Sequence, residues 1–195
     1  MSLPKIITVD KKDADRALRT ITLGFSTDPV QRWIWPEASV YLNAKPRFAH
    51  ASAGKGLDHG TTFAVDGFKA VAMWLPSGVS TDSDAMGAIV AETARPEILE
   101  DLINIGASLA AAHPQEPHWY LNFIACDPAY LGQGLGSALM KHALQKIDEG
   151  GAAAFLESSN PRNMTLYERH GFEAVGKVQH GSSPPLYPMV RPARR

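Results

Sequence analysis

The stretch that decides the fold runs from Trp119 to Gly136 and reads WYLNFIACDPAYLGQGLG. Its first eight residues form an apolar run typical of a buried strand, and Asp127-Pro128 closes that run. Three glycines at alternate positions follow, and a helical pattern begins directly after them. The apolar face of this helix carries Leu139, Ala143, Leu144 and Ile147. The stretch therefore predicts a strand, a glycine-rich turn and a helix in immediate succession.

The regions on either side alternate between expected strands and helices. Strands are expected at 6–9, 61–65, 69–75, 153–157, 172–175 and 186–190, and helices at 14–25, 39–53, 85–94, 97–112 and 164–170. Asp66-Gly67 predicts a hairpin turn between two of the strands. Residues 28–36 place two tryptophans between two prolines and are expected to form a loop. This order of elements predicts an α/β protein.

Composition excludes several classes of protein. Lys and Arg number 19 against 20 Asp and Glu, a net charge of −1, so there is no basic excess of the kind that nucleic-acid binding needs. The lone cysteine, Cys126, cannot form an intramolecular disulfide. No apolar run is long enough to span a bilayer, and no signal-type segment is found at the start. We expect a cytoplasmic protein with no nucleic-acid or membrane partner.

The glycine-rich turn has a specific physical use. The first N–H groups of a helix lack intrahelical partners, and glycines let the backbone approach an anion, so a phosphate is the natural occupant. A P-loop would need Lys and then Ser or Thr after the last glycine, where Ser137-Ala138 stands. A dinucleotide fingerprint needs a different glycine spacing from that of Gly132, Gly134 and Gly136. The turn thus predicts a phosphate cradle of another type.

Residues 124–139 resemble the acetyl-CoA signature of the GNAT superfamily of N-acetyltransferases. Residues 157–172, ESSNPRNMTLYERHGF, are similar to the second signature of that family, in which an asparagine lies seven residues before a tyrosine. Phrases around residues 116–121 and 155–158 resemble the puromycin N-acetyltransferase-like branch. One departure is visible, because the usual Gln or Arg of the first signature falls on Leu131.

The resemblance implies a fold and a division of labour along the chain. The fold would be α/β of the α+β type, with a central mixed, mostly antiparallel sheet and helices on both faces. Residues 1–195 would form a single domain, with an acceptor-side half at 1–112 and an acetyl-CoA-binding half at 113–195. Acetyl-CoA would act as co-substrate, and no metal is expected. The cofactor-binding residues would be Ile124, Ala125, Cys126, Gly132, Gln133, Gly134, Leu135, Gly136, Ser137, Asn160 and Asn163.

The resemblance also implies catalytic roles. Tyr167 matches the tyrosine that donates a proton to the departing CoA thiolate, and its alternative is a half-buried aromatic on an amphipathic helix. Glu157, at the end of a strand, is the first candidate for the base that deprotonates the amine. Asp127, Glu116 and His118 are reserve candidates. Cys126 is interpreted as a small core residue rather than a nucleophile.

The activity implied is direct transfer of an acetyl group to the primary amine of a small molecule. The alternatives are a non-catalytic acyl-CoA-binding or sensor module and an acetyltransferase that acts on protein amines. Trp33, Trp35 and Trp74 could line the acceptor pocket or only pack. An exposed carboxy-terminal strand edge makes a homodimer an expectation.

Overall fold

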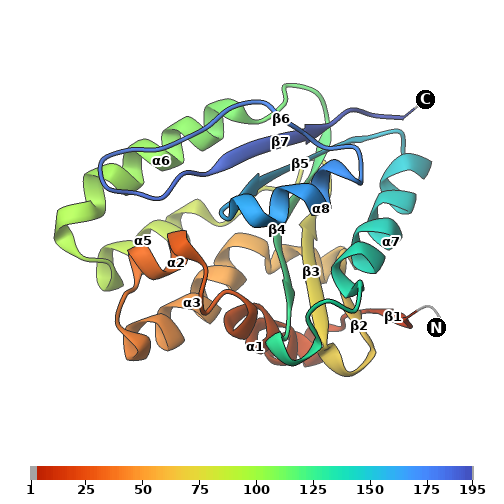
Figure 1. Cartoon of the computed structure of the whole chain (residues 1–195), viewed down its shortest axis with the longest axis horizontal. Coiled ribbons are helices and arrows are strands. Elements are labelled where there is room, and N and C mark those ends of the chain that lie inside the picture. The colour runs from red at the N-terminus through yellow and green to blue at the C-terminus, as the bar shows by residue number, and fades with distance from the viewer. Residues whose placement is uncertain (1–3, 195) are drawn as a thin grey trace.

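The computed structural model describes residues 4–194, and a seven-stranded sheet lies at its centre (Figure 1). The strand order is β1-β2-β3-β4-β5-β7-β6, and the one parallel pair described is β4 with β5. The strands are β1 (Ile6–Thr8), β2 (Thr62–Val65), β3 (Ala70–Leu75), β4 (His118–Cys126), β5 (Ala153–Ser158), β6 (Glu173–Ala174) and β7 (Tyr187–Arg191). The expected mixed, mostly antiparallel sheet is confirmed.

Helices cover both faces of this sheet, as expected. The helices are α1 (Ala14–Gly24), α2 (Pro29–Ile34), α3 (Ala38–Ala53), α4 (Lys55–Asp58), α5 (Ser83–Thr93), α6 (Leu99–Ala112), α7 (Leu135–Glu149) and α8 (Met164–Glu168). α7 packs Leu139, Met140 and Ala143 into a core with Trp74 and Phe63 on one face. α1 and α3 form a second core on the other face, around residues such as Ile21, Val71 and Phe123.

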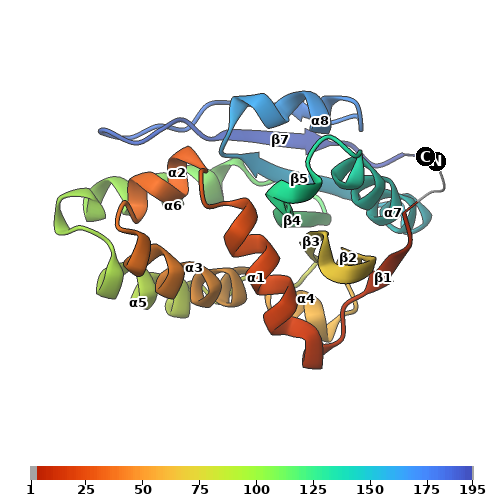
Figure 2. The same cartoon turned by 60° about the horizontal axis from the view of Figure 1, so that its bottom comes forward.

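A third apolar cluster joins α2, α3, α5 and α6 beside the sheet. Figures 1 and 2 show these four helices together at one end of the molecule, away from β1 and α7. The segment between β6 and β7 closes this cluster with Val178 and Leu186, and its His180 Nε2 lies 2.9 Å from Ser108 Oγ on α6. The sheet and the four-helix cluster therefore meet along the edge where β4 and β5 end.

A bulge in β4 shapes that edge. Met73 pairs with Phe123 and Trp74 pairs with Leu121, so Asn122 is an extra residue in β4. Because one inserted residue reverses the side-chain alternation, Leu121 packs in the α7 core whereas Phe123 packs in the α1 core. The parallel pairing of β4 with β5 ends at Leu121 and Leu156 in the described chain. Beyond this point β4 continues along β3, while β5 continues along β7.

Two expectations for local structure were wrong. Residues 28–36 contain the short helix α2, because the Asp28 carboxylate accepts a hydrogen bond from the Gln31 N–H at 3.0 Å and Pro29 occupies the first helical turn. The strand expected at 172–175 is reduced to Glu173–Ala174, since Phe172 instead packs in the α7 core. The four-residue helix α4 was not expected from the sequence.

An ion pair links β7 to α7, and its removal tests how much this contact stabilises the fold. Arg191 donates to both carboxylate oxygens of Asp148, at 2.7 and 2.8 Å, and its side chain is 2% exposed. Asp148→Ala leaves the guanidinium buried without a carboxylate, so we expect the free energy of unfolding to fall by about 3 kcal/mol in urea denaturation at neutral pH. Glu149→Ala, one residue further along the helix, is the control and should change little.

The same pair predicts a pH dependence with a definite sign. Hydrogen bonding to Arg191 holds the pKa of Asp148 below its ordinary value. The stabilisation is therefore present above the pKa of the unfolded carboxyl, about 4, and is lost as the pH falls through the folded pKa. The difference between wild type and Asp148→Ala should shrink in acid, and a difference that is constant with pH would contradict this account.

Candidate active site

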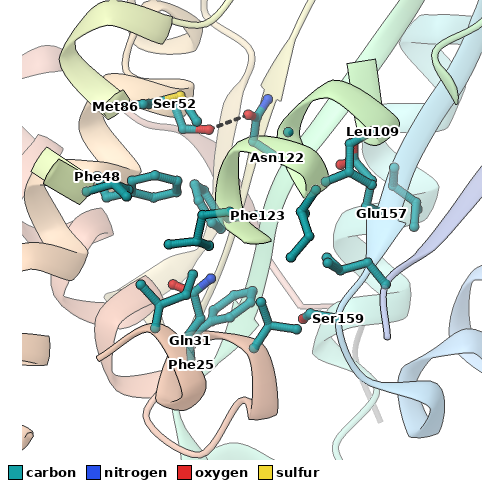
Figure 3. A pocket seen from close by; sticks show the side chains of 18 of the residues that line it. Phe25, Gln31, Phe48, Ser52, Met86, Leu109, Asn122, Phe123, Glu157 and Ser159 are labelled. Atoms are coloured by element: carbon teal, nitrogen blue, oxygen red, sulfur yellow. Dashed lines mark hydrogen bonds between the residues drawn. The ribbon is translucent and has the colours of Figure 1, made fainter. Parts of the chain in front are cut away.

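A cavity of about 630 Å³ occupies the place where the sheet meets the four-helix cluster. Its walls come from both halves of the chain: α2, α3, α5 and α6 on one side and β4, β5 and α8 on the other. Figure 3 shows Phe48 and Met86 facing the cavity from one side, Glu157 from the opposite side, and Gln31 and Phe25 below. Four of the residues singled out in the sequence meet here, namely Ile124, Glu157, Asn163 and Tyr167.

Two aromatic side chains contact the Glu157 carboxylate, and neither contact was predicted from the sequence. The carboxylate accepts a hydrogen bond from Tyr120 Oη at 2.7 Å, and His113 Nε2 lies 3.5 Å from the other carboxylate oxygen. Burial, and then the Glu157 charge, raises the pKa of Tyr120 well above its ordinary value, so this phenol remains a donor. The Glu157 side chain is only 9% exposed, and its open direction is the cavity.

A second histidine extends this arrangement away from the cavity. His113 Nδ1 lies 3.0 Å from His118 Nε2, and His118 Nδ1 lies 2.9 Å from the backbone oxygen of Glu116. Of the reserve candidates for a base, His118 is thus linked to Glu157 through His113. The Glu116 side chain belongs to an exposed residue, and Asp127 is occupied in accepting the Ala129 N–H at 2.9 Å.

Tyr167 lies on α8 with its ring buried and its side chain lining the cavity. Burial, and then the nearby charge of Asp28, raises the pKa of the phenol well above its ordinary value. The group therefore carries its proton throughout the neutral range, as a general acid must. Asn160 begins the turn before α8, where its side-chain oxygen accepts the Arg162 N–H at 3.1 Å. The Asn160 side chain therefore caps this turn.

The edge of β4 beyond the bulge presents backbone groups rather than reactive side chains. Ile124 lines the cavity, whereas the Ala125 side chain packs in the α1 core. Cys126 donates from its thiol to the backbone oxygen of Asp127 at 3.4 Å. Burial, and then the charge of Asp127, raises the pKa of this thiol, which disfavours the nucleophilic thiolate. The interpretation of Cys126 as a small strand residue fits these surroundings.

The glycine-rich turn ends at α7, whose first turn is capped by no side chain. Gly132 and Gly134 have φ values of +76° and +75°, a conformation that glycine adopts without strain. Gln133 and Leu131 are exposed. Ser137 Oγ lies 2.9 Å from His170 Nε2, a contact between the start of α7 and the second residue after α8. The turn forms a helix N-terminus with uncapped N–H groups, which is a geometry suited to an anion.

A buried polar cluster lies beneath the cavity and was not anticipated from the sequence. Asp28 accepts from Gln31 N–H and also from Ser159 Oγ at 2.5 Å. Lys45 is fully buried, and its Nζ lies 3.9 Å and 4.4 Å from the ring centroids of Phe123 and Phe25, two residues that line the cavity. Burial, opposed by the charge of Asp28, lowers the pKa of Lys45 to about 7.

The three tryptophans pack rather than line the cavity. Trp35 is buried and donates to Thr93 Oγ1 at 2.9 Å, Trp74 is buried in the α7 core, and Trp33 donates to Ser182 Oγ at 3.1 Å. Within residues 4–194, no group of three His, Cys, Asp or Glu side chains is placed to hold a metal ion. Over the same residues, no helix combines the length and the apolar character that crossing a bilayer requires.

Comparison with known sequences finds similarity to acetyltransferases. The family model described as the acetyltransferase (GNAT) family matches residues 68–172. Mycothiol acetyltransferase from Propionibacterium freudenreichii is 26% identical over 169 residues, which cover 77% of this chain and 51% of that protein. The ribosomal protein bS18-alanine N-acetyltransferase of Escherichia coli is 40% identical over 52 residues, 25% of this chain and 35% of that protein. The chain thus matches about half of the first relative's length and about a third of the second's.

Solved structures share the fold over nearly the whole chain. A Corynebacterium glutamicum protein described as histone acetyltransferase HPA2 and related acetyltransferase superposes with a TM-score of 0.70 at 22% identity, covering 100% of this chain and 98% of that one. The polyamine N-acetyltransferase of Drosophila melanogaster gives a TM-score of 0.69 at 15% identity, with coverages of 95% and 98%. At these identities the comparison establishes the fold.

Lys45 provides a test of the cluster beneath the cavity. An unfolded lysine keeps its proton up to a pH of about 10.4, whereas the folded pKa is about 7, so the free energy of unfolding should rise with pH between these values. Lys45→Met removes the buried amine, and we expect it to be about 1–2 kcal/mol more stable than wild type at pH 6, with the difference shrinking towards pH 9. Lys177→Met, at an exposed position, is the control. A variant that is less stable at pH 6 would show that Lys45 is held as a favourable cation.

Proposed function

Because the chain belongs to the acetyltransferase (GNAT) family, we propose that it transfers an acetyl group from acetyl-CoA to the primary amine of a small molecule within a ternary complex. One observation carries the proposal. A single cavity is lined by the diverging edge of β4 at Ile124, by the protonated phenol of Tyr167 and by the buried carboxylate of Glu157. An acyl donor, a proton donor and a proton acceptor can therefore meet in one enclosed space.

The cofactor would bind along the edge that the bulge in β4 exposes. Backbone groups of Ile124, Ala125 and Cys126 would pair with the amides of the pantetheine arm, as an added strand pairs with a sheet edge. The pyrophosphate would lie on the N–H groups of the turn from Gly132 to Ser137, at the start of α7. Asn163, which lines the cavity, and Asn160, in the turn before α8, would contact the pantetheine arm from the α8 side. In this arrangement residues 113–195 hold the cofactor and residues 1–112 enclose the acceptor.

The reaction balances with groups already in the cavity. The amine nitrogen attacks the acetyl carbonyl carbon, a C–N bond forms, and the C–S bond to CoA breaks. Before this attack, the ammonium form of the amine gives one proton to Glu157. The departing thiolate takes a proton from Tyr167, and the second proton, which the nitrogen loses as the amide forms, returns to that phenol. Backbone N–H groups at the β4 edge would stabilise the oxyanion.

Hydrogen-bonding rules assign a direction to the two histidines behind Glu157. A backbone oxygen only accepts, so His118 Nδ1 carries the hydrogen that faces Glu116. Neutral His118 then accepts at Nε2, and His113 donates to it from Nδ1. When both rings are neutral, this arrangement leaves a lone pair on His113 Nε2, 3.5 Å from Glu157, where it can take up a proton. The carboxylate thus has a proton acceptor on the side away from the substrate, and we propose that His113 takes up the proton that Glu157 removes from the amine.

Acceptors of different kinds are named for the relatives. One acts on the alanine of a ribosomal protein, one is named for mycothiol, and one is named for polyamines. For this chain the position of α5 and α6 over the cavity favours a small molecule over a protein terminus. A cytoplasmic location, membership of the puromycin-like branch and a homodimer formed through the sheet edge stay predictions.

The activity itself is tested by thiol release from acetyl-CoA across a panel of amines and peptides, and absence of turnover with all of them would overturn it.

Tyr167→Phe tests the proton donor and the sensor alternative together. The ring remains and the proton is lost, so we expect kcat to fall by about 100-fold while the affinity for CoA, measured by calorimetry, is unchanged. Tyr187→Phe, on β7, is the control. Unchanged turnover in Tyr167→Phe would mean that water protonates the thiolate, and tight CoA binding with no turnover in wild type would favour the sensor module.

His113→Gln tests the proton acceptor behind Glu157. We expect kcat to fall by about 10-fold at neutral pH, because the proton on Glu157 then lacks its next site. The deficit should disappear as the pH approaches the pKa of the amine substrate, where the amine arrives already deprotonated. His59→Gln, at an exposed position, is the control. An equal deficit at every pH would indicate that His113 only supports Tyr120 and Phe155 by packing.

A further inference from the structure

The chemistry of the cavity walls restricts which amine can enter. Of the side chains that line the cavity within residues 4–194, Glu157 alone carries a formal charge. The walls contributed by α2, α3, α5 and α6 are mainly aliphatic and aromatic, with residues such as Ile34, Phe48, Val90 and Leu109. The cavity therefore has one site for an ammonium or amine group and a large remaining volume that is apolar.

Two pairs of polar side chains in the cavity are hydrogen-bonded to each other, Ser52 with Asn122 and Tyr120 with Glu157, whereas the buried Gln31 Oε1 has no hydrogen-bond partner among the described residues. Ser52 Oγ donates to Asn122 Oδ1 at 2.6 Å (Figure 3). Asn122 Nδ2 lies 3.4 Å from the Tyr120 backbone oxygen. The carboxylate of Asp28 is close to the cavity but does not line it, and its two oxygens accept from Gln31 N–H and Ser159 Oγ. A second positive charge on the substrate would find no second carboxylate among the described side chains that line the cavity.

The rim of the cavity is apolar on the side formed by α5 and α6, whereas Asn163 is exposed on the α8 side. Ile103 on α6 lines the cavity and is 71% exposed, and Leu102 and Met86 lie nearby on the α6 and α5 walls. A large apolar residue held at the surface beside an apolar cavity is typical of an entrance for an apolar ligand. The α5 and α6 side of the rim thus has the same apolar character as the interior walls beside it.

We propose that the acceptor is a primary monoamine with an apolar, arylalkyl or alkyl body. Its amine lies against Glu157 and Tyr120, and its body lies among α3, α5 and α6. The role of the amine as acetyl acceptor rests on the proposed transfer reaction. The selection for a single positive charge depends only on the chemistry of the cavity walls. Burying a second ammonium without a carboxylate is costly, so di- and polyamines are excluded by the same walls that hold the apolar body.

Two amines of equal chain length make the test. Hexylamine and hexamethylenediamine differ by a second ammonium at the far end, and we expect kcat/KM to favour hexylamine by about 100-fold. Equal values, or a preference for the diamine or for a peptide, would overturn the inference. Calorimetry of both amines with the CoA-loaded protein separates the two proposals. Selective binding of hexylamine without turnover contradicts the transfer reaction alone, while turnover that favours the diamine contradicts the substrate class alone.

A pair of variants on α5 tests the same selection by changing the cavity wall instead of the amine. Met86→Glu introduces a carboxylate on α5, opposite Glu157 in Figure 3, and Met86→Gln introduces a similar side chain without charge. We expect Met86→Glu to shift the preference towards hexamethylenediamine by about 10-fold relative to Met86→Gln. Identical preferences in the two variants would show that the amine body does not reach α5 and would overturn its placement.

Discussion

The divergence of β4 from β5 at Asn122 is the constraint on which the rest of the site depends. Two parallel strands that stayed paired would satisfy each other's backbone groups and leave no space between them. The extra residue in β4 ends that pairing after Leu121 and Leu156, and it turns Phe123 to the opposite face from Leu121. Backbone groups are thereby exposed at the point where the four-helix cluster leaves a cavity.

Few charged side chains lie around this opening, and each has defined partners. Glu157 is held by Tyr120 and backed by His113, so its one free direction is the cavity. Asp28 and Lys45 are buried beneath the cavity, where the first caps α2 and the second packs against aromatic rings. Neither of these two charges lines the space in which an acceptor would lie. In the proposed reaction a single carboxylate would therefore serve both as the proton acceptor and as the charge that selects the acceptor amine.

The sequence predicted the fold well where patterns are local. The strand from Trp119, the glycines and the helix after them, and the pairing turn at Asp66-Gly67 depend on neighbouring residues, and they were found as expected. α2 was missed because the Asp28 cap outweighs a stretch rich in tryptophan and proline. The partnership of Glu157 with Tyr120 and His113 was missed because it joins residues brought together by the β4–β5 pairing. Lys45 was missed because burial of a helical lysine depends on tertiary packing.

Amide hydrogen exchange with and without CoA measures the central claim most directly. If the opened edge of β4 receives the pantetheine arm, the amides of residues 122–126 and of the turn 132–137 should exchange more slowly when CoA is bound. The amides of β2, which lies far from the opening in the strand order, should be unaffected. Binding of CoA, seen by calorimetry, with no added protection at residues 122–126 would show that the divergence of the two strands serves another purpose.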